Sequence, residues 1–275
     1  MSVLAYIKYP VWTMREYIVS PRRALRNTRL ALAIFWRTFY LGVFCGVIRT
    51  LKSHVGGQRA QKWSERTRGR YIWRVAQRFW ARWSLEKLGV HLSHSGLEHV
   101  DWSRPHILVS NHQSSLDILF MVALVPNGRF VAKKEVLFFP VIGDAVCFGG
   151  QIVVDRGNHE QAMQAVRTGM ETWPDSNLIF FAESTRTRDG KLQPFKRGAF
   201  VMARDTGIPI LPVAIIGAFE ALPKGSLLRF ATSPRIHVAF GSEILVSRKA
   251  LVEDIIRETR HAITKLMRNG AHPLS

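Results

Sequence analysis

Residues 106–125 read HILVSNHQSSLDILFMVALV, an apolar run that passes through a short polar turn into a second apolar run. The first run, 106–110, has the length of a buried strand, and 114–125 is long enough for a helix. A strand followed by a helix is the repeating unit of α/β proteins with a largely parallel sheet. The stretch therefore indicates the fold class, and it places Asn111, His112 and Asp117 where a strand ends.

The chain beyond about residue 100 repeats this alternation and predicts a mixed, mostly parallel sheet flanked by helices on both faces. Asn158 is a predicted N-cap and Gly207 the residue that closes a helix. Further strands are predicted at 129–132, 151–154, 177–182, 210–216 and 235–240, and further helices at 134–146, 159–172, 196–206 and 250–268.

Two prolines, Pro209 and Pro212, interrupt the apolar stretch GIPILPVAIIG at 207–217. Proline has no amide hydrogen to donate to a neighbouring strand, so prolines in a sheet gather at its edges or at irregular places. The pattern therefore predicts that this strand is an edge strand or an irregular wall.

The positive charge is concentrated in the first third of the chain. Of the formal net charge of +19, residues 1–90 carry 18 Lys and Arg against three acids, or +15. Such charge is typical of proteins that bind nucleic acids or anionic membranes. Here Trp, Phe, Ile, Leu and Val lie between the charges, and no zinc, homeodomain or RNA-recognition pattern is present. The composition favours a membrane interface and no nucleic-acid partner.

Two segments carry this membrane hypothesis. Residues 30–48, LALAIFWRTFYLGVFCGVI, are 19 residues with one charge, Arg37, long enough to span a bilayer or to form a half-buried re-entrant helix. Residues 66–89 predict a helix with a basic stripe and an apolar stripe, as in helices of the lipid headgroup layer; packing on a folded domain with the arginines in water is the alternative. The stripes are Arg66, Arg70, Arg74, Arg78 and Arg82, and Ile72, Val75, Phe79 and Trp83.

These features divide the chain into basic membrane-associated helices at 1–65, an α/β domain at 66–250 and a C-terminal helix at 251–275. Its two cysteines, Cys45 and Cys147, have no ligand or disulfide spacing. The loose cluster His91, His94 and His99 has no accompanying ligand set. The sequence therefore predicts no metal site.

His112 and Asp117 form a candidate catalytic pair. A carboxylate bonded to Nδ1–H of a histidine holds the tautomer in which Nε2 accepts a proton, and stabilises the imidazolium that results. Although Ser114 and Ser115 are close, no Ser or Cys is clearly placed as the attacking group. The simplest mechanism lets the pair deprotonate a substrate hydroxyl; a helix-start histidine with an unrelated surface aspartate is the alternative.

Polar residues also follow later strands, in GGQIVVDR (149–156) and FFAESTRTRDG (180–190). Together with NHQSSLD and the proline-interrupted strand, these blocks resemble the glycerolipid acyltransferases, specifically bacterial 1-acyl-sn-glycerol-3-phosphate acyltransferases. The resemblance covers about residues 70 to 245. The blocks are NHxxxxD, matched by Asn111, His112 and Asp117; Gly-x-Ile ending in Arg, matched by Gly150, Ile152 and Arg156; the usual FPEGTR, matched by Phe181, Glu183, Thr185 and Arg186; and the interrupted strand, matched by Pro209 and Pro212.

The resemblance implies transfer of a fatty acyl group from acyl-CoA or acyl carrier protein to the free hydroxyl of lysophosphatidic acid, giving phosphatidic acid. It implies His112 as the base and Asp117 as its orienting partner. No cofactor is implied, and the partners are the donor, the lysophospholipid acceptor and membrane lipids. The implied location is a membrane, the bacterial inner membrane, with the site on its cytoplasmic face. The implied substrate-binding residues are Arg156, Glu183, Ser184, Thr185, Arg186 and Lys133, and the structural ones are Asn111, Gly150, Pro209 and Pro212.

The third block departs from the family pattern, because it has Ala182 for the usual Pro and Ser184 for the usual Gly. Without glycine, this turn is expected to be restricted to φ < 0. The departure makes another lysolipid or a lipid-linked amine credible as acceptor. Two further hypotheses stay open apart from it: an inactive membrane-binding relative, and a hydrolase that uses the same pair on water.

Overall fold

The computed structural model describes residues 69–138, 149–155, 157–225 and 230–270, together with Leu25 and Val146. In these ranges the strands form one seven-stranded sheet in the order β1-β7-β6-β2-β5-β3-β4. All neighbours pair in parallel except β6 and β7, so the predicted mixed, mostly parallel sheet is confirmed. The strands are β1 His91–Ser95, β2 Ile107–Ser110, β3 Gly128–Lys133, β4 Ile152–Val154, β5 Asn177–Phe181, β6 Ile210–Ile216 and β7 Arg235–Phe240.

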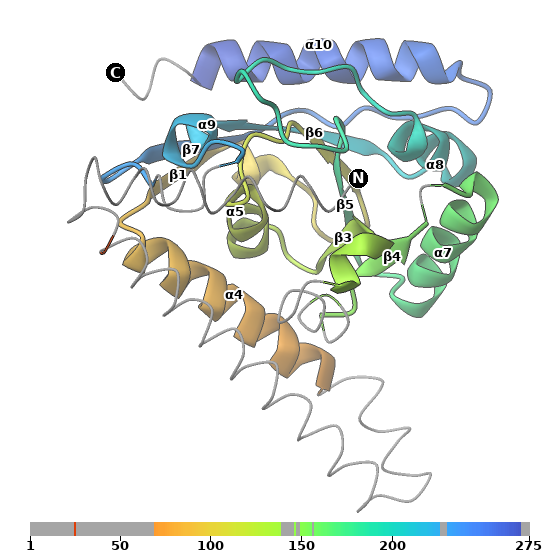
Figure 1. Cartoon of the computed structure of the whole chain (residues 1–275). Helices are drawn as coiled ribbons and strands as arrows, with labels where there is room; N and C mark the ends of the chain where they lie inside the picture. The colour runs from red at the N-terminus through yellow and green to blue at the C-terminus, as the bar shows by residue number, and fades with distance from the viewer. Residues whose placement is uncertain are drawn as a thin grey trace, which may run out of the picture.

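Helices cover both faces of the sheet, as the alternating pattern predicts. One core cluster joins α4 (Gly69–Lys87) and α5 (Asp117–Leu124) to one face. A second cluster joins α7 (His159–Thr172), α8 (Gly198–Thr206) and α10 (Val252–Gly270) to the other. Figure 1 shows α10 along one side of the sheet and α4 descending from the opposite side. Three short helices complete the described part: η2 Leu97–His99, η3 Lys134–Phe138 and α9 Ala218–Ala221.

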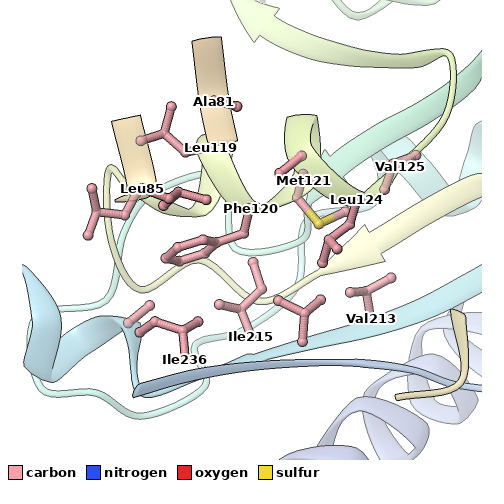
Figure 2. Packing of buried hydrophobic residues seen from close by; sticks show 14 of the residues in the cluster. Ala81, Leu85, Leu119, Phe120, Met121, Leu124, Val125, Val213, Ile215 and Ile236 are labelled. Carbon is pink, nitrogen blue, oxygen red and sulfur yellow. The ribbon is translucent and has the colours of Figure 1, made fainter. Parts of the chain in front are cut away.

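The core under α4 and α5 centres on Phe120, whose side chain is fully buried. Figure 2 shows it between Ala81 and Leu85 of α4 and the strand residues Ile215 and Ile236. Full burial of a side chain of this size contributes about 1.5–3 kcal/mol. Because Phe120 lies three residues after Asp117, this packing also fixes where the first turn of α5 begins.

Of the two alternatives expected for the proline-interrupted strand, an edge strand or an irregular wall, the structure contradicts the first. β6 is not an edge strand, because it pairs with β2 on one side and β7 on the other. Regular pairing with β7 begins only at Val213, while Pro212 accepts a hydrogen bond from the Gly241 amide and Ile210 forms an isolated bridge with Ile244. The missing amide hydrogen of Pro212 thus falls where the β6–β7 ladder is already interrupted.

β1 is the strand that sequence reasoning missed. Its sequence, HLSHS, has no apolar run, since the strand is short, largely exposed and paired only with β7. The strand signal was absent because an edge strand without two buried faces needs no apolar residues on both faces. Of the histidines noted in the sequence, His91 and His94 therefore belong to an edge strand.

The predicted helix ends are close to those observed. The Asn158 side chain accepts a hydrogen bond of 3.0 Å from the Gln161 amide, and Gly207 closes α8 with φ 74°; both predictions are confirmed. The predicted C-terminal helix 250–268 is observed as α10, and the predicted helix 134–146 is described only as η3, with most of its remainder outside the described residues. The segments predicted at 1–65 and 30–48 also lie outside them, apart from Leu25.

The helix α4 packs on the domain along part of its length, and its contact with a membrane stays a prediction. Ala81 and Leu85 are buried against the domain, whereas Val75 and Phe79 are exposed by 49% and 66%. Its last two turns therefore pack on α5, and earlier turns present apolar side chains to the surroundings. Across the ranges that the structure describes, no helix is both long and apolar enough to cross a bilayer.

Candidate active site

The site lies where β2, β5 and β6 end. These strands are parallel neighbours, so their carboxyl ends meet at one edge of the sheet, where α/β proteins place ligands. Asn111 follows β2 directly and is fully buried. Its amide group exchanges two hydrogen bonds of 2.8 Å with the backbone of Ile215. Asn111 thus joins the turn after β2 to β6, which agrees with its predicted structural role in the turn.

His112 and Asp117 are brought together by the start of α5. The His112 Nδ1 atom lies 2.8 Å from Asp117 Oδ2, and the same oxygen accepts hydrogen bonds from the amides of Gln113 at 2.7 Å and Ser114 at 2.9 Å. Because a carboxylate oxygen can only accept, the imidazole ring must carry a hydrogen on Nδ1 to bond with it. Three donors therefore converge on Asp117 Oδ2. The tautomer with a free Nε2 lone pair follows.

The dyad is unevenly exposed. The Asp117 side chain is fully buried, and that of His112 is 15% exposed. The imidazole also stacks on Phe181, the last residue of β5, with ring centroids 4.0 Å apart and an interplanar angle of 12°. The aspartate is thus shielded from water, while the histidine ring keeps one accessible edge for a substrate.

Glu183 holds the backbone of the dyad from the β5 side. One carboxylate oxygen accepts the His112 amide at 2.8 Å and the other accepts the Gln193 amide at 2.7 Å. The Thr187 amide in turn donates to the His112 carbonyl at 2.9 Å. Burial raises the pKa of the Glu183 carboxyl above its ordinary value, although the two amide hydrogen bonds act in the opposite direction. Both oxygens are thus occupied by backbone amides; contact with a substrate stays a prediction for this residue.

The segment that supplies the Gln193 amide is itself held by α10. Arg260 donates to the carbonyl of Gln193 at 2.6 Å and to that of Leu192 at 3.0 Å. Its guanidinium also lies 5.2 Å from the centroid of the Phe195 ring. Sequence reasoning did not find Arg260, and no local signal could reveal it, because the contact joins residues 67 positions apart.

The unusual third block contains a residue with a positive φ, contrary to the expectation from its sequence. Ser184 has φ 59°, so the expected restriction of this turn to φ < 0 is wrong. The residue occupies the left-handed region that glycine adopts freely and other residues enter at some cost. Ala182 donates its amide hydrogen to the Ser110 carbonyl at 2.8 Å. A proline at this position could not make that bond, so the alanine adds a link between β5 and β2 that the usual residue lacks.

Two cationic side chains lie beside this turn. Arg186 donates to the Ser115 hydroxyl at 2.6 Å, which links the exits of β5 and β2. Lys224 lies in the turn after α9 and donates to the Thr185 hydroxyl at 2.8 Å and to the Arg186 carbonyl at 3.1 Å. Sequence reasoning missed Lys224, although the rule that parallel strands end at one edge could have pointed to the chain after the strand 210–216.

The remaining predicted residues lie apart from this cluster or outside the described part. Lys133 ends β3, which is separated from β2 by β5. Gly150 has φ 60°, and an added Cβ would come within 2.7 Å of Arg129 Nη1, which agrees with a structural role. Arg156 is outside the described residues. Within the described ranges, no group of three or more His, Cys, Asp or Glu side chains could hold a metal ion.

Comparison with known proteins shows which family this region resembles. Residues 91–216 match the family described as Acyltransferase, and these residues contain the dyad, Glu183 and Arg186. Over these residues the chain is similar to the acyltransferase family, and the match covers a little under half of its length. The match begins at β1 and ends with β6, so the matched region includes all three strands that carry the site.

Curated relatives share this region. The chain is similar to a chloroplastic 1-acyl-sn-glycerol-3-phosphate acyltransferase of Brassica napus, with 37% identity over 48% of this chain and 39% of the relative. It is also similar to the human 1-acyl-sn-glycerol-3-phosphate acyltransferase alpha, with 37% identity over 46% of each chain. The matched region thus spans less than half the length of both relatives.

A solved structure shares the fold. The crystal structure of the 1-acyl-sn-glycerophosphate acyltransferase PlsC from Thermotoga maritima matches with a TM-score of 0.70 and 23% sequence identity, covering 90% of this chain and 97% of that one. The arrangement of strands and helices is therefore the fold of that crystal structure.

Proposed function

We propose that this protein transfers a fatty acyl group from an acyl thioester to the free hydroxyl of lysophosphatidic acid, giving phosphatidic acid for phospholipid synthesis. The observation that carries the proposal is the His112–Asp117 pair, with Nδ1 2.8 Å from an Oδ2 atom that two backbone amides also hold. The names of the relatives, which are 1-acyl-sn-glycerol-3-phosphate acyltransferases, supply the acceptor.

In the proposed reaction, His112 Nε2 takes the proton of the acceptor hydroxyl while its oxygen attacks the thioester carbonyl. Asp117 stabilises the imidazolium that forms. The tetrahedral intermediate then collapses, the carbon–sulfur bond breaks, and the imidazolium returns its proton to the leaving thiolate. The ester and the free thiol are the only products, so the reaction needs a co-substrate but no cofactor.

Negative charge on the carbonyl oxygen of this intermediate needs a hydrogen-bond donor. The amide of His112 is bonded to Glu183, and those of Gln113 and Ser114 are bonded to Asp117. The Ser115 amide has no acceptor among the described residues, so it is the donor that this turn can offer to an oxyanion.

Arg186 supports an acceptor that carries phosphate. A guanidinium has five donors and binds phosphate in a bidentate manner. One nitrogen of Arg186 bonds the Ser115 hydroxyl next to the dyad, which leaves further donors for a ligand. The arrangement favours a phosphate-bearing acceptor over water, and thereby favours transfer over hydrolysis.

The test is transfer of radiolabelled acyl groups to lysophosphatidic acid, with acyl-CoA and acyl carrier protein as alternative donors and membranes that contain the full chain. Labelled phosphatidic acid is the expected product with at least one donor. Transfer to a different lysolipid alone would replace the proposed acceptor. Release of free fatty acid, without transfer to any lysolipid, would identify a hydrolase instead.

We also propose that α4 lies at a membrane surface, because its exposed Val75 and Phe79 accompany the exposed Arg82. Basic and apolar side chains on one helix are typical of interfacial helices. A predicted inner-membrane location with the site on the cytoplasmic face agrees with an acceptor whose acyl chain is already in the bilayer.

This placement predicts where a fluorescent label meets lipid. In a background with Cys45→Ser and Cys147→Ser, an environment-sensitive label on Phe79→Cys is expected to shift its emission to the blue on vesicles with anionic lipid. A label on Leu251→Cys is the control, because Leu251 is equally exposed, at 67%, but precedes α10 on the other side of the sheet. Equal shifts at both positions, or none at 79, would contradict the placement of α4.

A further inference from the structure

Three cationic side chains gather beside the dyad: Arg186, Arg188 and Lys224. Arg186 and Arg188 follow β5, and Lys224 follows α9. In the part of the chain that the structure describes, none of the three forms an ion pair with a carboxylate, whereas Arg197, Arg204 and Arg257 each do. Like charges repel when no counterion separates them, so this cluster is arranged for an anion that the described part of the chain does not supply.

Lys224 is held in place by contacts on both sides of the site. Two residues before it, the Leu222 carbonyl accepts a hydrogen bond of 2.9 Å from the Ser114 hydroxyl. Its own ammonium group bonds Thr185 and the Arg186 carbonyl. The peptide that begins with this carbonyl contains the Thr187 amide, which bonds the His112 carbonyl. Lys224 is therefore connected to the backbone of His112 through one peptide group.

The two best-placed cations retain donors for a ligand. An ammonium group has three hydrogens, of which Lys224 uses two, and a guanidinium has five, of which Arg186 uses one on Ser115. Burial lowers the pKa of the Lys224 ammonium, and the charges of Arg188 and Arg186 lower it further. A bound anion would relieve both the repulsion and the unfavourable burial of the charge.

We propose that Lys224, together with Arg186, binds the phosphate monoester of the acceptor and selects it over phosphodiester headgroups. The inference rests on the proposed acyl transfer to a lysolipid. A phosphate monoester carries a charge of about −1.5 to −2 at neutral pH and three free oxygens. A phosphodiester carries one charge and only two free oxygens, so it gains less from a second cation. Lys224 thereby determines acceptor specificity from beside the turn of the third block, whose sequence departs from the usual one.

Equilibrium binding tests this without depending on turnover. The dissociation constants of lysophosphatidic acid and lysophosphatidylcholine, with the same acyl group, are measured for the full-length protein in detergent. The proteins compared are the wild type and the variants Lys224→Met, Lys224→Arg and Lys265→Met. Lys224→Met is expected to weaken binding of lysophosphatidic acid by about 10- to 100-fold, the effect of losing one charge-assisted hydrogen bond. Binding of lysophosphatidylcholine should change by less than about 3-fold, and Lys224→Arg should restore most of the loss. Lys265→Met, which removes a charge from the exposed face of α10, is expected to change neither.

The outcomes separate this inference from the proposed activity. Unchanged affinity of Lys224→Met for lysophosphatidic acid, or equal losses for both lipids, would overturn the role of Lys224 even where the wild type transfers acyl groups. Wild-type binding that does not distinguish the two lipids would overturn it as well. A phosphate could also come from the nucleotide of acyl-CoA. If Lys224→Met raised KM for acyl-CoA but not for acyl-phosphopantetheine, and left KM for lysophosphatidic acid unchanged, the cations would bind the donor and the proposal would be refuted.

Discussion

Replacement of His112 with glutamine is expected to lower kcat for acyl transfer by about 100- to 10,000-fold, the usual contribution of a general base. The change keeps a polar side chain of similar size beside Phe181 but removes the proton acceptor. Single-turnover transfer to lysophosphatidic acid measures it, with the melting temperature as a control for folding. Retention of more than a tenth of the wild-type rate would show that another group takes the proton.

Asp117→Asn is the matched variant that separates charge from geometry. The amide oxygen can replace Oδ2 and keep the hydrogen bonds from Gln113, Ser114 and Nδ1, while the amide nitrogen replaces Oδ1, which has no partner among the described residues. The histidine tautomer is therefore preserved, and only the stabilisation of the imidazolium is lost. We expect Asp117→Asn to be less damaging than Asp117→Ala, and the double variant with His112→Gln to add little, because residues that act as a unit are not additive.

Glu183→Gln is expected to lower both stability and activity. The variant retains one acceptor oxygen, but its amide nitrogen faces the amide of either His112 or Gln193, so one buried donor loses its partner. Such a loss costs about 1–3 kcal/mol. The His112 backbone is then held less precisely, and misplacement of a catalytic group lowers kcat, here by about 10-fold or more. Chemical unfolding in detergent and single-turnover rates measure the two effects.

The difference in stability between the wild type and Glu183→Gln is expected to depend on pH. Because burial raises the pKa of Glu183, the folded protein keeps this proton at pH values where the unfolded chain has lost it. The carboxyl therefore contributes most to stability below its unfolded pKa, and this contribution falls as the pH rises toward the folded pKa. Glutamine does not titrate. The free energy of unfolding of wild type minus that of Glu183→Gln should thus decrease with rising pH across this interval and stay constant above it. A difference that increases with pH would show that the pKa of Glu183 is lowered instead.

Local pattern was sufficient for most of the sheet. Strands that are buried on both faces appear in the sequence as short apolar runs. The strands 210–216 and 235–240 were predicted with the observed bounds because nearly all of their residues are buried. The edge strand β1 has no such run. An edge position, one of the two alternatives expected for β6, followed from a correct property of proline. Whether the missing amide hydrogen matters depends on where the partner strand ends, and β7 ends at Phe240.

The candidate site divides in the same way. Asn111, His112 and Asp117 lie within seven residues, so a strand exit and the first turn of one helix bring them together. Glu183 and Arg186 were predicted through the family pattern, but the two amides that Glu183 holds and the Ser115 hydroxyl that Arg186 bonds were not. Spacing in the sequence carries no information on contacts between loops that follow different strands.

The sequence by itself determined the alternation of strands and helices, the dyad and the acyltransferase resemblance, because each depends on residues that are close in the chain. Only the tertiary structure decided that Ser184 adopts a positive φ, that Arg260 of α10 holds the segment behind Glu183, and that Lys224 joins Arg186 beside His112. These features depend on which strands become neighbours. That order is set by the burial of whole faces of the sheet, to which every element contributes and which no short stretch encodes.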